Sequence, residues 1–218
     1  MGTIGGNLCL DTRCNYYDQN YEWRKAIDFC MKKDGSTCWV ATSSPKCLAV
    51  SSTDTAPALI ALDASFRIAG PSGERTVPAA DFFTLPAANP LHENVLKDGE
   101  VLAAITVPAA SASTRSTYHK VMDREAWTHA VVSAAIALEM NGDVCQRARI
   151  VLGGVAPIPW RLPEVERMLA GQRITPELAA RAGEAAVAGA RPLAKNGYKV
   201  PLTRAVVKRT LESLGRSG

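Results

Sequence analysis

Four widely spaced cysteines near the start of the chain constrain its fold more than any other feature. Their spacing is Cys14-x15-Cys30-x7-Cys38-x8-Cys47. The residues between them show no sustained alternation of apolar and polar side chains, and only the stretch from 22 to 32 has the periodicity of a helix. We therefore expect something other than a hydrophobic core to hold this segment together.

The cysteine spacing narrows the choice of bound group without deciding it. Zinc sites usually bring their ligands in C-x2-4-C pairs and bacterial ferredoxins use C-x2-C runs, and this chain has neither. A cubane iron–sulfur cluster needs only four thiolates brought together by the fold, so long gaps are acceptable. Buried or free cysteines are the alternative. Cys9 and Cys145 are additional, and we expect Cys145, beside a predicted strand, to lie in the core.

The composition is that of a soluble globular protein with one large domain or two small ones. The chain has 218 residues, of which 47% are hydrophobic and 21% are charged. Its net charge of +4 is modest and its basic residues are scattered, which argues against nucleic acid as a partner. The longest apolar run, residues 131–138, is too short to span a bilayer, so no membrane association is expected.

Cysteine usage points to the cytoplasm. Five of the six cysteines lie between residues 9 and 47, and the first residues lack the basic and apolar regions of a signal peptide. In a chain without an export signal, clustered cysteines are more often metal ligands or redox groups than disulfides. We therefore expect a cytoplasmic protein.

The rest of the chain predicts an α+β fold. The first half predicts a helix at 56–64 and three strands, and the small, flexible stretch 108–114 predicts a domain boundary. The second half predicts three antiparallel strands, two of them joined by the hairpin signal Asn141-Gly142, and then three helices. The predicted strands are 66–69, 75–77, 101–107, 116–121, 131–140 and 146–152, and the later helices are 163–170, 175–190 and 202–214.

A glycine pair precedes the cysteine segment and an aspartate follows it. The segment Thr3–Asn7 reads TIGGN, a backbone suited to close approach because glycine has no side chain to clash. Gly-Gly-Asn is also a common turn. Asp54 could simply cap the helix after it, and Lys120 and Arg124 could be solvated strand residues. The three histidines are far apart in the sequence, so we interpret them as structural.

Together these features resemble the FAD-binding subunit of the molybdenum hydroxylases, the xanthine dehydrogenase and carbon monoxide dehydrogenase group. Most members run from the first motif to the second through a short loop, where this chain has its cysteine segment. That segment resembles the insertion of the 4-hydroxybenzoyl-CoA reductase β subunit, which carries a [4Fe-4S] cluster. The matching motifs are TIGGN at 3–7, S-x-D-x-x-P-A-L at 52–59, Glu100-x-Leu102 leading to Val107-Pro108, Tyr118-x-Lys120-x-x-x-Arg124 and LGGVAP at 152–157.

The resemblance implies a two-domain architecture. Residues 1–110 would be the C-terminal part of a PCMH-type FAD-binding domain, with a [4Fe-4S] insertion loop at 8–50. Residues 111–218 would be the flavoprotein C-terminal domain, a three-stranded antiparallel sheet with a three-helix bundle. The family's FAD domain normally begins with a small α/β lobe that binds the pyrophosphate. We therefore expect this chain to be N-terminally truncated and to bind FAD weakly on its own.

The resemblance also implies which residues bind the cofactors. Backbone N–H groups of the glycine pair would approach the flavin, and Lys120 would supply positive charge or a donor beside it. No acid, base or nucleophile in this chain would act on the substrate. The implied FAD contacts are Thr3, Ile4, Gly5, Gly6, Asn7, Asp54, Leu102 and Lys120, and the implied cluster ligands are Cys14, Cys30, Cys38 and Cys47.

By this resemblance the chain is an electron-transfer subunit of an oxidoreductase. It would relay electrons between a ferredoxin-type donor, [4Fe-4S], FAD and the [2Fe-2S] clusters of a small partner subunit, while a molybdopterin-binding large subunit reduces an aromatic acyl-CoA. The first alternative is the flavin subunit of a xanthine, aldehyde or CO dehydrogenase-type enzyme, because substrate choice would lie in the molybdenum subunit. The second is a non-catalytic fragment whose cysteine loop binds zinc or nothing.

Overall fold

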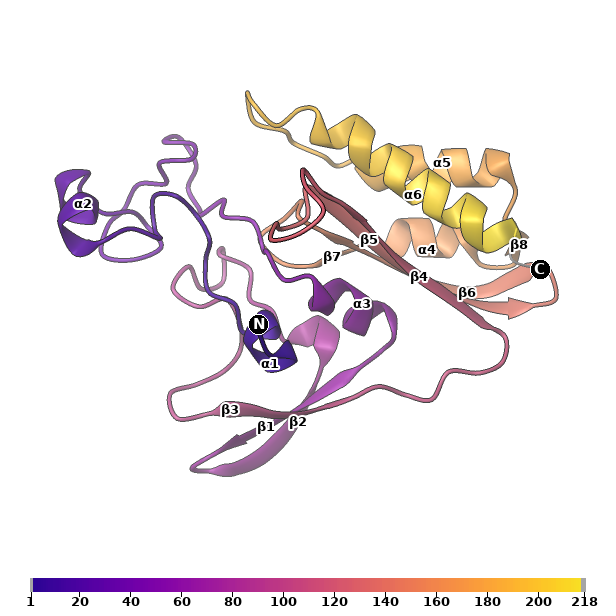
Figure 1. Ribbon diagram of the computed structural model, residues 1–218, viewed down its shortest axis with the longest axis horizontal. Coiled ribbons are helices and arrows are strands. Elements are labelled where there is room, and N and C mark those ends of the chain that lie inside the picture. The colour runs from indigo at the N-terminus through magenta and orange to yellow at the C-terminus, as the bar shows by residue number, and fades with distance from the viewer. Residues whose placement is uncertain (1, 217–218) are drawn as a thin grey trace.

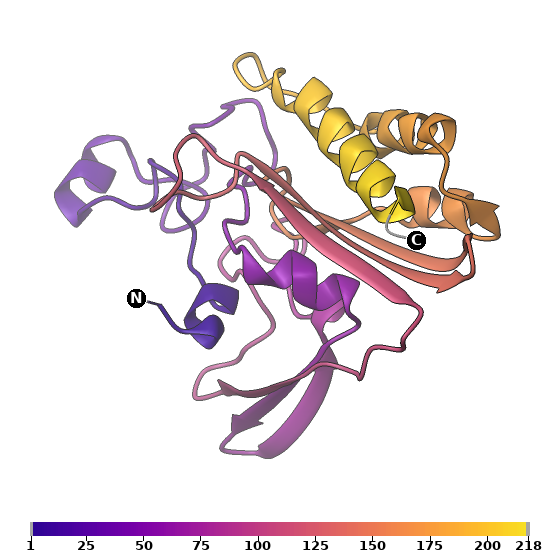
Figure 2. The same ribbon diagram turned by 45° about the vertical axis from the view of Figure 1, so that its right-hand side comes forward.

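The computed structural model describes residues 2–216 and confirms the α+β fold (Figure 1). Two antiparallel sheets lie on opposite sides of helix α3 (Thr55–Ala61), and three helices cover the far face of the larger sheet (Figure 2). The layers are therefore the smaller sheet, α3, the larger sheet and the three helices. One hydrophobic core lies on each side of the larger sheet.

The larger sheet is built around a long hairpin. Strands β5 (Val132–Asn141) and β6 (Val144–Gly153) pair antiparallel, and Gly142 in their turn has a φ of 57°, a left-handed conformation that suits glycine. Strand β4 (Thr114–Val121) pairs with the other edge of β5, so the three predicted strands are present. Two short strands that the sequence does not predict pair with β6: β7 (Trp160–Arg161) and β8 (Gln172–Arg173).

Strand β5 is buried on both faces because it lies between two layers. Ile136 and Leu138 belong to the core beneath the helices, whereas the alternate residues Ala135 and Ala137 belong to the core around α3. Successive side chains of a strand point to opposite faces, which produces this division. The small alanine side chains allow α3 to lie close to the sheet.

Three helices cover the sheet, as predicted: α4 (Pro163–Leu169), α5 (Pro176–Val187) and α6 (Lys199–Arg216). Helix α5 begins where a threonine cap predicts, because Thr175 Oγ1 accepts a hydrogen bond from Leu178 N at 3.2 Å. Helix α6 begins earlier than the predicted residue 202. Its inner face packs on the core of the sheet through Val206, Val207, Leu211 and Leu214.

The smaller sheet has the strand order β2-β1-β3. Strand β1 (Ser65–Gly70) pairs antiparallel with β2 (Gly73–Pro78) and with β3 (Val101–Thr106), in agreement with the predicted strands. Phe66 on β1 packs edge to face on Phe82, with 5.0 Å between the ring centroids. This aromatic pair anchors the core between the smaller sheet and α3.

A buried arginine on β6 joins the two halves of the molecule at the C-terminal end of α3. Arg149 Nε donates to the carbonyl oxygen of Ala61 at 2.5 Å, and Nη1 pairs with Asp63 at 2.9 Å and with Glu139 at 3.0 Å. Carbonyl groups in the last turn of a helix lack partners within the helix, so this contact satisfies one of them. Helix α3 is thereby fixed to the larger sheet.

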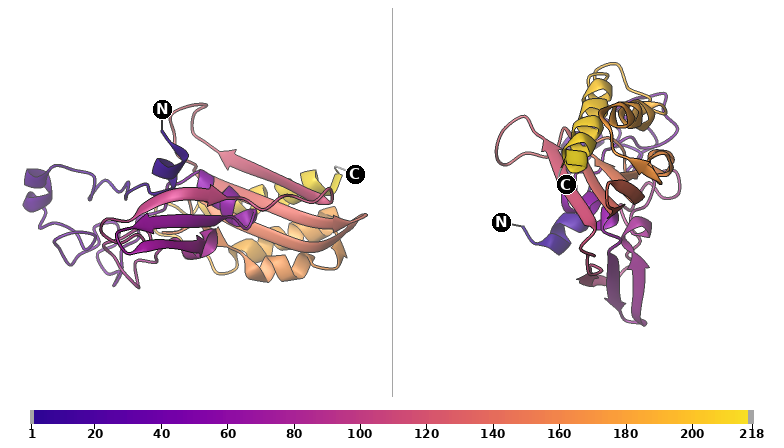
Figure 3. Two further views of the ribbon diagram at one scale, coloured as in Figure 1. Left: turned by 90° about the horizontal axis from the view of Figure 1, so that it is seen from below. Right: turned by 90° about the vertical axis from the view of Figure 1, so that its right-hand side faces the viewer.

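Residues 9–52 project from this body as a lobe with little regular structure (Figures 1 and 3). The lobe contains the single short helix α2 (Tyr21–Ala26). The helix predicted over 22–32 is wrong beyond Ala26, because Asp28 and Phe29 have φ values of 62° and 55°, which a right-handed helix cannot accommodate. No helix between residues 2 and 216 is long and apolar enough to cross a membrane.

Two short helical segments pack against the core around α3 and do not form layers of their own. Helix α1 (Ile4–Leu8) contains the glycine pair, so the segment expected as a turn is helical, and buried Leu8 joins the core around α3. The 3-10 helix η1 (Ala79–Asp81) follows β2 and buries Ala79 in the same core. Both segments therefore attach the loops beside them to the smaller sheet.

Candidate functional site

Asn7 closes the base of the cysteine lobe. Its Oδ1 lies at the N-terminus of α3, where the first N–H groups of the helix have no partner within it. One side-chain oxygen thus joins the two ends of the lobe to α3. The donors to Asn7 Oδ1 are Thr53 Oγ1 at 2.9 Å, Asp54 N at 3.1 Å, Thr55 N at 3.0 Å and Thr55 Oγ1 at 2.8 Å.

Asp54 occupies the cap position of α3, but its side chain makes no capping hydrogen bond. Its Oδ2 instead accepts from Lys120 Nζ at 2.8 Å, and Oδ1 accepts from the Tyr118 hydroxyl at 3.4 Å. Lys120 also donates to the carbonyl of Thr128 at 2.9 Å, and only 18% of its side chain is exposed. Lys120 is therefore a paired, largely buried cation and not a solvated strand residue.

Tyr118 is kept in its protonated form beside this pair. Burial raises the pKa of its hydroxyl to about 12, and the neighbouring Asp54 carboxylate contributes to the shift. A neutral tyrosine remains a hydrogen-bond donor at any physiological pH. The cluster of Asp54, Tyr118 and Lys120 therefore offers one carboxylate already engaged by two donors.

The glycine segment presents an open surface next to this cluster. Thr3 Oγ1 accepts from Gly6 N at 3.0 Å and so caps α1. A Cβ atom added to Gly5 would meet nothing within 4 Å, so contacts within the described chain do not require glycine there. Ile4 is 54% exposed. This bare, exposed backbone fits the approach of a flat cofactor, which would fill the space that a side chain at Gly5 would occupy.

The predicted FAD residues are brought together with one exception. Hydrogen bonds link Asn7 to Asp54 and Asp54 to Lys120, so the segment Thr3–Asn7 and strand β4 meet at the start of α3. Leu102 lies on β3 and packs, partly buried, against the core of the smaller sheet. Its place in that core is sufficient to account for its apolar side chain.

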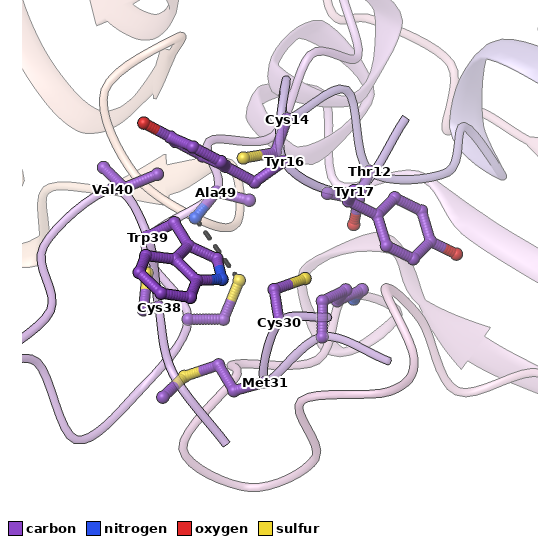
Figure 4. Close-up of a pocket in the computed structure, with 12 residues that line it drawn as sticks. Thr12, Cys14, Tyr16, Tyr17, Cys30, Met31, Cys38, Trp39, Val40 and Ala49 are labelled. Carbon is purple, nitrogen blue, oxygen red and sulfur yellow. Dashed lines mark hydrogen bonds between the residues drawn. The ribbon is translucent and has the colours of Figure 1, made fainter. Parts of the chain in front are cut away.

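The four predicted cluster ligands converge on one pocket in the projecting lobe (Figure 4). Cys30, Cys38 and Cys47 are buried and Cys14 is half-buried. Between residues 2 and 216, no three cysteine, histidine or acidic side chains are grouped tightly enough to hold a single metal ion. The remaining lining residues are Thr12, Tyr16, Tyr17, Met31, Lys32, Trp39, Val40 and Ala49.

The thiols of the pocket interact electrostatically. Burial raises the pKa of Cys14 and of Cys47, and the charge of a Cys38 thiolate would raise both further. The backbone N–H of Ala49 donates to Cys47 Sγ at 3.5 Å, and this hydrogen bond lowers the pKa of Cys47. Several thiolates crowded into a buried site need positive charge to stabilise them, and iron or zinc provides it.

Lys32 is a buried cation on the wall of the pocket. Its side chain is 4% exposed, and Nζ pairs with Glu93 Oε1 at 2.6 Å. The Thr12 hydroxyl donates to the same carboxylate oxygen. Glu93 belongs to the irregular stretch between η1 and β3, so this ion pair attaches the cysteine lobe to the body of the FAD-binding half.

A second buried cation, Arg24, holds the outer part of the lobe. Its guanidinium lies 5.6 Å from the ring centroid of Tyr17 and 5.5 Å from that of Phe29. It also donates to the carbonyl oxygen of Lys33 at 2.8 Å. Arg24 therefore packs against aromatic rings in the lobe, as a large aliphatic side chain does in an ordinary hydrophobic core.

Two family models match consecutive parts of the chain. Residues 1–110 match the FAD binding domain in molybdopterin dehydrogenase, and residues 117–214 match the CO dehydrogenase flavoprotein C-terminal domain. The chain belongs to the FAD-binding molybdopterin dehydrogenase family. The resemblance to the flavin subunit of the molybdenum hydroxylases is therefore confirmed at the level of the family, and FAD is the cofactor of the first domain.

Individual relatives agree with this assignment. The aldehyde oxidoreductase FAD-binding subunit PaoB of Escherichia coli (strain K12) is 33% identical over 220 residues, which cover 98% of this chain and 64% of PaoB. The carbon monoxide dehydrogenase medium chain of Hydrogenophaga pseudoflava is 33% identical over 162 residues, covering 72% of this chain and 54% of the relative. The chain thus spans between about half and two thirds of these relatives.

A solved structure supports the fold. Carbon monoxide dehydrogenase from Hydrogenophaga pseudoflava, in a form that lacks the Mo-pyranopterin moiety, superposes with a TM-score of 0.67 at 32% identity. The match covers 75% of this chain and 56% of the other. These relatives are aldehyde and carbon monoxide oxidoreductases, so a particular closeness to 4-hydroxybenzoyl-CoA reductase is not among the findings.

Sequence reasoning missed Lys32 and Glu93, whose ion pair attaches the lobe to the body. Lys32 lies two positions after Cys30, and this proximity to a predicted cluster ligand is the one sequence signal that could have marked it as part of the site. Glu93 belongs to a stretch without periodicity or motif, and nothing in the sequence distinguishes it. The resemblance implies a flavin contact at Asn7, which stays a prediction; sequence reasoning missed the hydrogen bonds that Asn7 Oδ1 accepts at the N-terminus of α3.

Proposed function

We propose that this chain is the FAD-binding, electron-transfer subunit of a molybdenum hydroxylase of the aldehyde or carbon monoxide dehydrogenase type, and that the enzyme it serves oxidises an aldehyde. An alignment over 98% of the chain has to run through the cysteine lobe, whereas the carbon monoxide dehydrogenase alignment covers 72%. Residues of the aldehyde oxidoreductase subunit therefore align with the cysteine lobe. We place the protein in the cytoplasm.

The observation that carries the proposal is that one residue of the flavin segment, Asn7, also fixes the base of the lobe that contains the thiol pocket. Asn7 lies between the glycine segment and α3, and the lobe it closes directs Cys14, Cys30, Cys38 and Cys47 into one pocket. FAD would lie against Thr3–Asn7, with Lys120 beside it. When bound, FAD accepts or releases two electrons and a cluster exchanges single electrons.

The donor set of the pocket suits a [4Fe-4S] cluster. Four thiols and no imidazole or carboxylate line it, and cubane clusters are held by four cysteine thiolates. The lining is otherwise largely aromatic and aliphatic, which excludes water from the sulfurs. Cys14, Cys30, Cys38 and Cys47 would hold the cluster. A structural zinc ion or free thiols are the competing occupants.

We propose two partner subunits, because this chain transfers electrons and another subunit has to act on the substrate. Among the described residues, Asp54, Tyr118 and Lys120 form a partly buried group in which the carboxylate accepts from both donors, and we assign it no role on a substrate. A molybdopterin-binding large subunit would carry out the substrate chemistry, and a small subunit with [2Fe-2S] clusters would connect it to FAD. The relative from Hydrogenophaga pseudoflava is named a medium chain, a term that belongs to enzymes of several chains.

A second candidate function is electron input to an aromatic acyl-CoA reductase of the 4-hydroxybenzoyl-CoA type. The cysteine insertion is the observation in its favour. In that enzyme a ferredoxin-type donor would deliver low-potential electrons through the cluster. The assembled enzyme distinguishes the two: aldehyde-dependent dye reduction supports the first function, and reduction of 4-hydroxybenzoyl-CoA with dithionite as donor supports the second.

Two variants test the cofactor sites of the proposal. Cys38→Ser should lose the broad visible absorbance of the cluster after anaerobic purification, whereas Cys9→Ser, half-buried and outside the pocket, should retain it. Gly5→Val should weaken FAD binding in the assembled enzyme because its side chain fills the open surface. Full cluster absorbance in Cys38→Ser would contradict the ligand assignment.

A further inference from the structure

Lys32 is the one charged side chain among the described residues that line the thiol pocket. Arg24, the other buried cation of the lobe, is turned instead toward Asp34, the Lys33 carbonyl and two aromatic rings. A lysine whose side chain is 4% exposed is costly to bury unless it is compensated. Glu93 supplies one negative charge, at 2.6 Å from Nζ.

The ion pair has a second consequence for the pocket. Four cysteine thiolates would bring four negative charges to the same small region, and Lys32 lines that region together with the four cysteines. Lys32 therefore acts electrostatically on the sulfurs, and Glu93, with Thr12 donating to the same oxygen, fixes where its charge lies.

We propose that Lys32 sets the reduction potential of the cluster held by the four cysteines, and that Glu93 moderates it from the body of the FAD-binding half. This inference rests on the proposed [4Fe-4S] site. Reduction by one electron makes the site one unit more negative, so a fixed neighbouring cation stabilises the reduced form. Removing the charge of Lys32 lowers the potential, and removing the charge of Glu93 raises it.

A redox titration of the full chain tests the pair. The protein is purified anaerobically and reduced stepwise with dithionite, and the EPR signal of the reduced cluster gives the midpoint potential. In Lys32→Met the equilibrium constant for reduction should fall roughly tenfold, which corresponds to about 59 mV for one electron. Glu93→Gln should shift it in the opposite direction. Lys33→Met removes the same charge from an exposed neighbour and should leave it unchanged.

Opposite shifts are the decisive result, because loss of packing alone has no reason to produce them. Equal potentials in wild type and Lys32→Met, or shifts of the same sign in both variants, would overturn the inference. If Lys32→Met retains no iron, two other variants test the inference. The midpoint potential should rise in Glu93→Gln, and it should stay at the wild-type value in Lys32→Arg, which keeps the positive charge. A wild-type chain without iron and sulfide would refute the proposed cluster itself, which distinguishes the two failures.

Discussion

The cysteine lobe and the C-terminal half are stabilised by different means. Beneath α4, α5 and α6, the larger sheet buries a continuous set of aliphatic side chains, including Ile136, Leu138 and Ile150. Between residues 9 and 52, every fully buried residue is a cysteine, a threonine or a cation: Thr12, Arg24, Cys30, Lys32, Cys38 and Cys47.

The difference indicates what each region needs in order to fold. Burial of aliphatic groups stabilises the C-terminal half without any ligand. A segment that buries thiols and cations has no comparable hydrophobic gain, and small domains of this kind usually depend on a metal or a disulfide. All described cysteines are free thiols, so the lobe has no disulfide, and the cluster that we propose would add to the order that its ion pairs and stacked arginine provide.

The largest expected effect is on the lobe when iron is removed. A chelator under oxidising conditions, or the variant Cys38→Ser, should open the lobe to trypsin at exposed Lys25, Lys33 and Lys46. The larger sheet and its helices should stay resistant, which mass spectrometry of the fragments would reveal. Equal resistance of the lobe to trypsin with and without iron would show that the lobe, like the larger sheet, folds without a bound metal.

Leu138→Ala tests the opposite region. Leu138 is fully buried on β5, so the variant should lose about 2–5 kcal/mol of unfolding free energy through lost burial and a cavity. Urea unfolding followed by circular dichroism measures it, and the loss should be the same with or without iron. Leu91→Ala, at a position 60% exposed, should change stability by less than about 0.5 kcal/mol. A loss that depended on iron would mean that the halves are not independent.

Asn7→Ala tests the contact that joins the cysteine lobe to helix α3. Its Oδ1 accepts four hydrogen bonds at the N-terminus of α3, and loss of a capping side chain costs about 0.5–2 kcal/mol. Urea unfolding should report this loss together with faster cleavage of the lobe. Asn15→Ala, exposed within the lobe, is the matched control. An unchanged midpoint would argue that the lobe is closed elsewhere.

The smallest effect concerns pH and the smaller sheet. Hydrogen bonds from Arg75 lower the pKa of Glu100 to about 2 from its usual 4.5. Because the folded-state pKa is depressed, the contribution is present above about pH 4.5 and is lost as the pH falls toward about 2. The difference in urea midpoint between wild type and Glu100→Gln should therefore shrink over that range. A constant difference would assign the effect to packing.

The sequence predicts the elements of the C-terminal half because local signals decide them. Asn141-Gly142 gives the hairpin, Thr175 caps α5, and the burial of Cys145 follows from its place on β6. The two-residue strands β7 and β8 escape prediction because they exist only through pairing with β6.

Reasoning from sequence fails where distant residues meet. The spacing of the cysteines leaves their role open, and only the resemblance to a cluster-binding insertion assigns them to one site; the structure directs them into one pocket. That Asn7 caps α3, so that Asp54 can pair with Lys120, depends on contacts across the whole lobe. The same holds for Lys32 and Glu93, and no local pattern encodes such a pair. The early end of α2 depends on left-handed backbone at Asp28 and Phe29, and although aspartate adopts this conformation more often than most residues, phenylalanine does not.

Iron and acid-labile sulfide analysis of the anaerobically purified chain tests the central claim most directly. A single cubane on Cys14, Cys30, Cys38 and Cys47 predicts about four iron and about four sulfide per chain. Zinc near one equivalent without sulfide, or a metal-free chain whose lobe still resists protease, would contradict it.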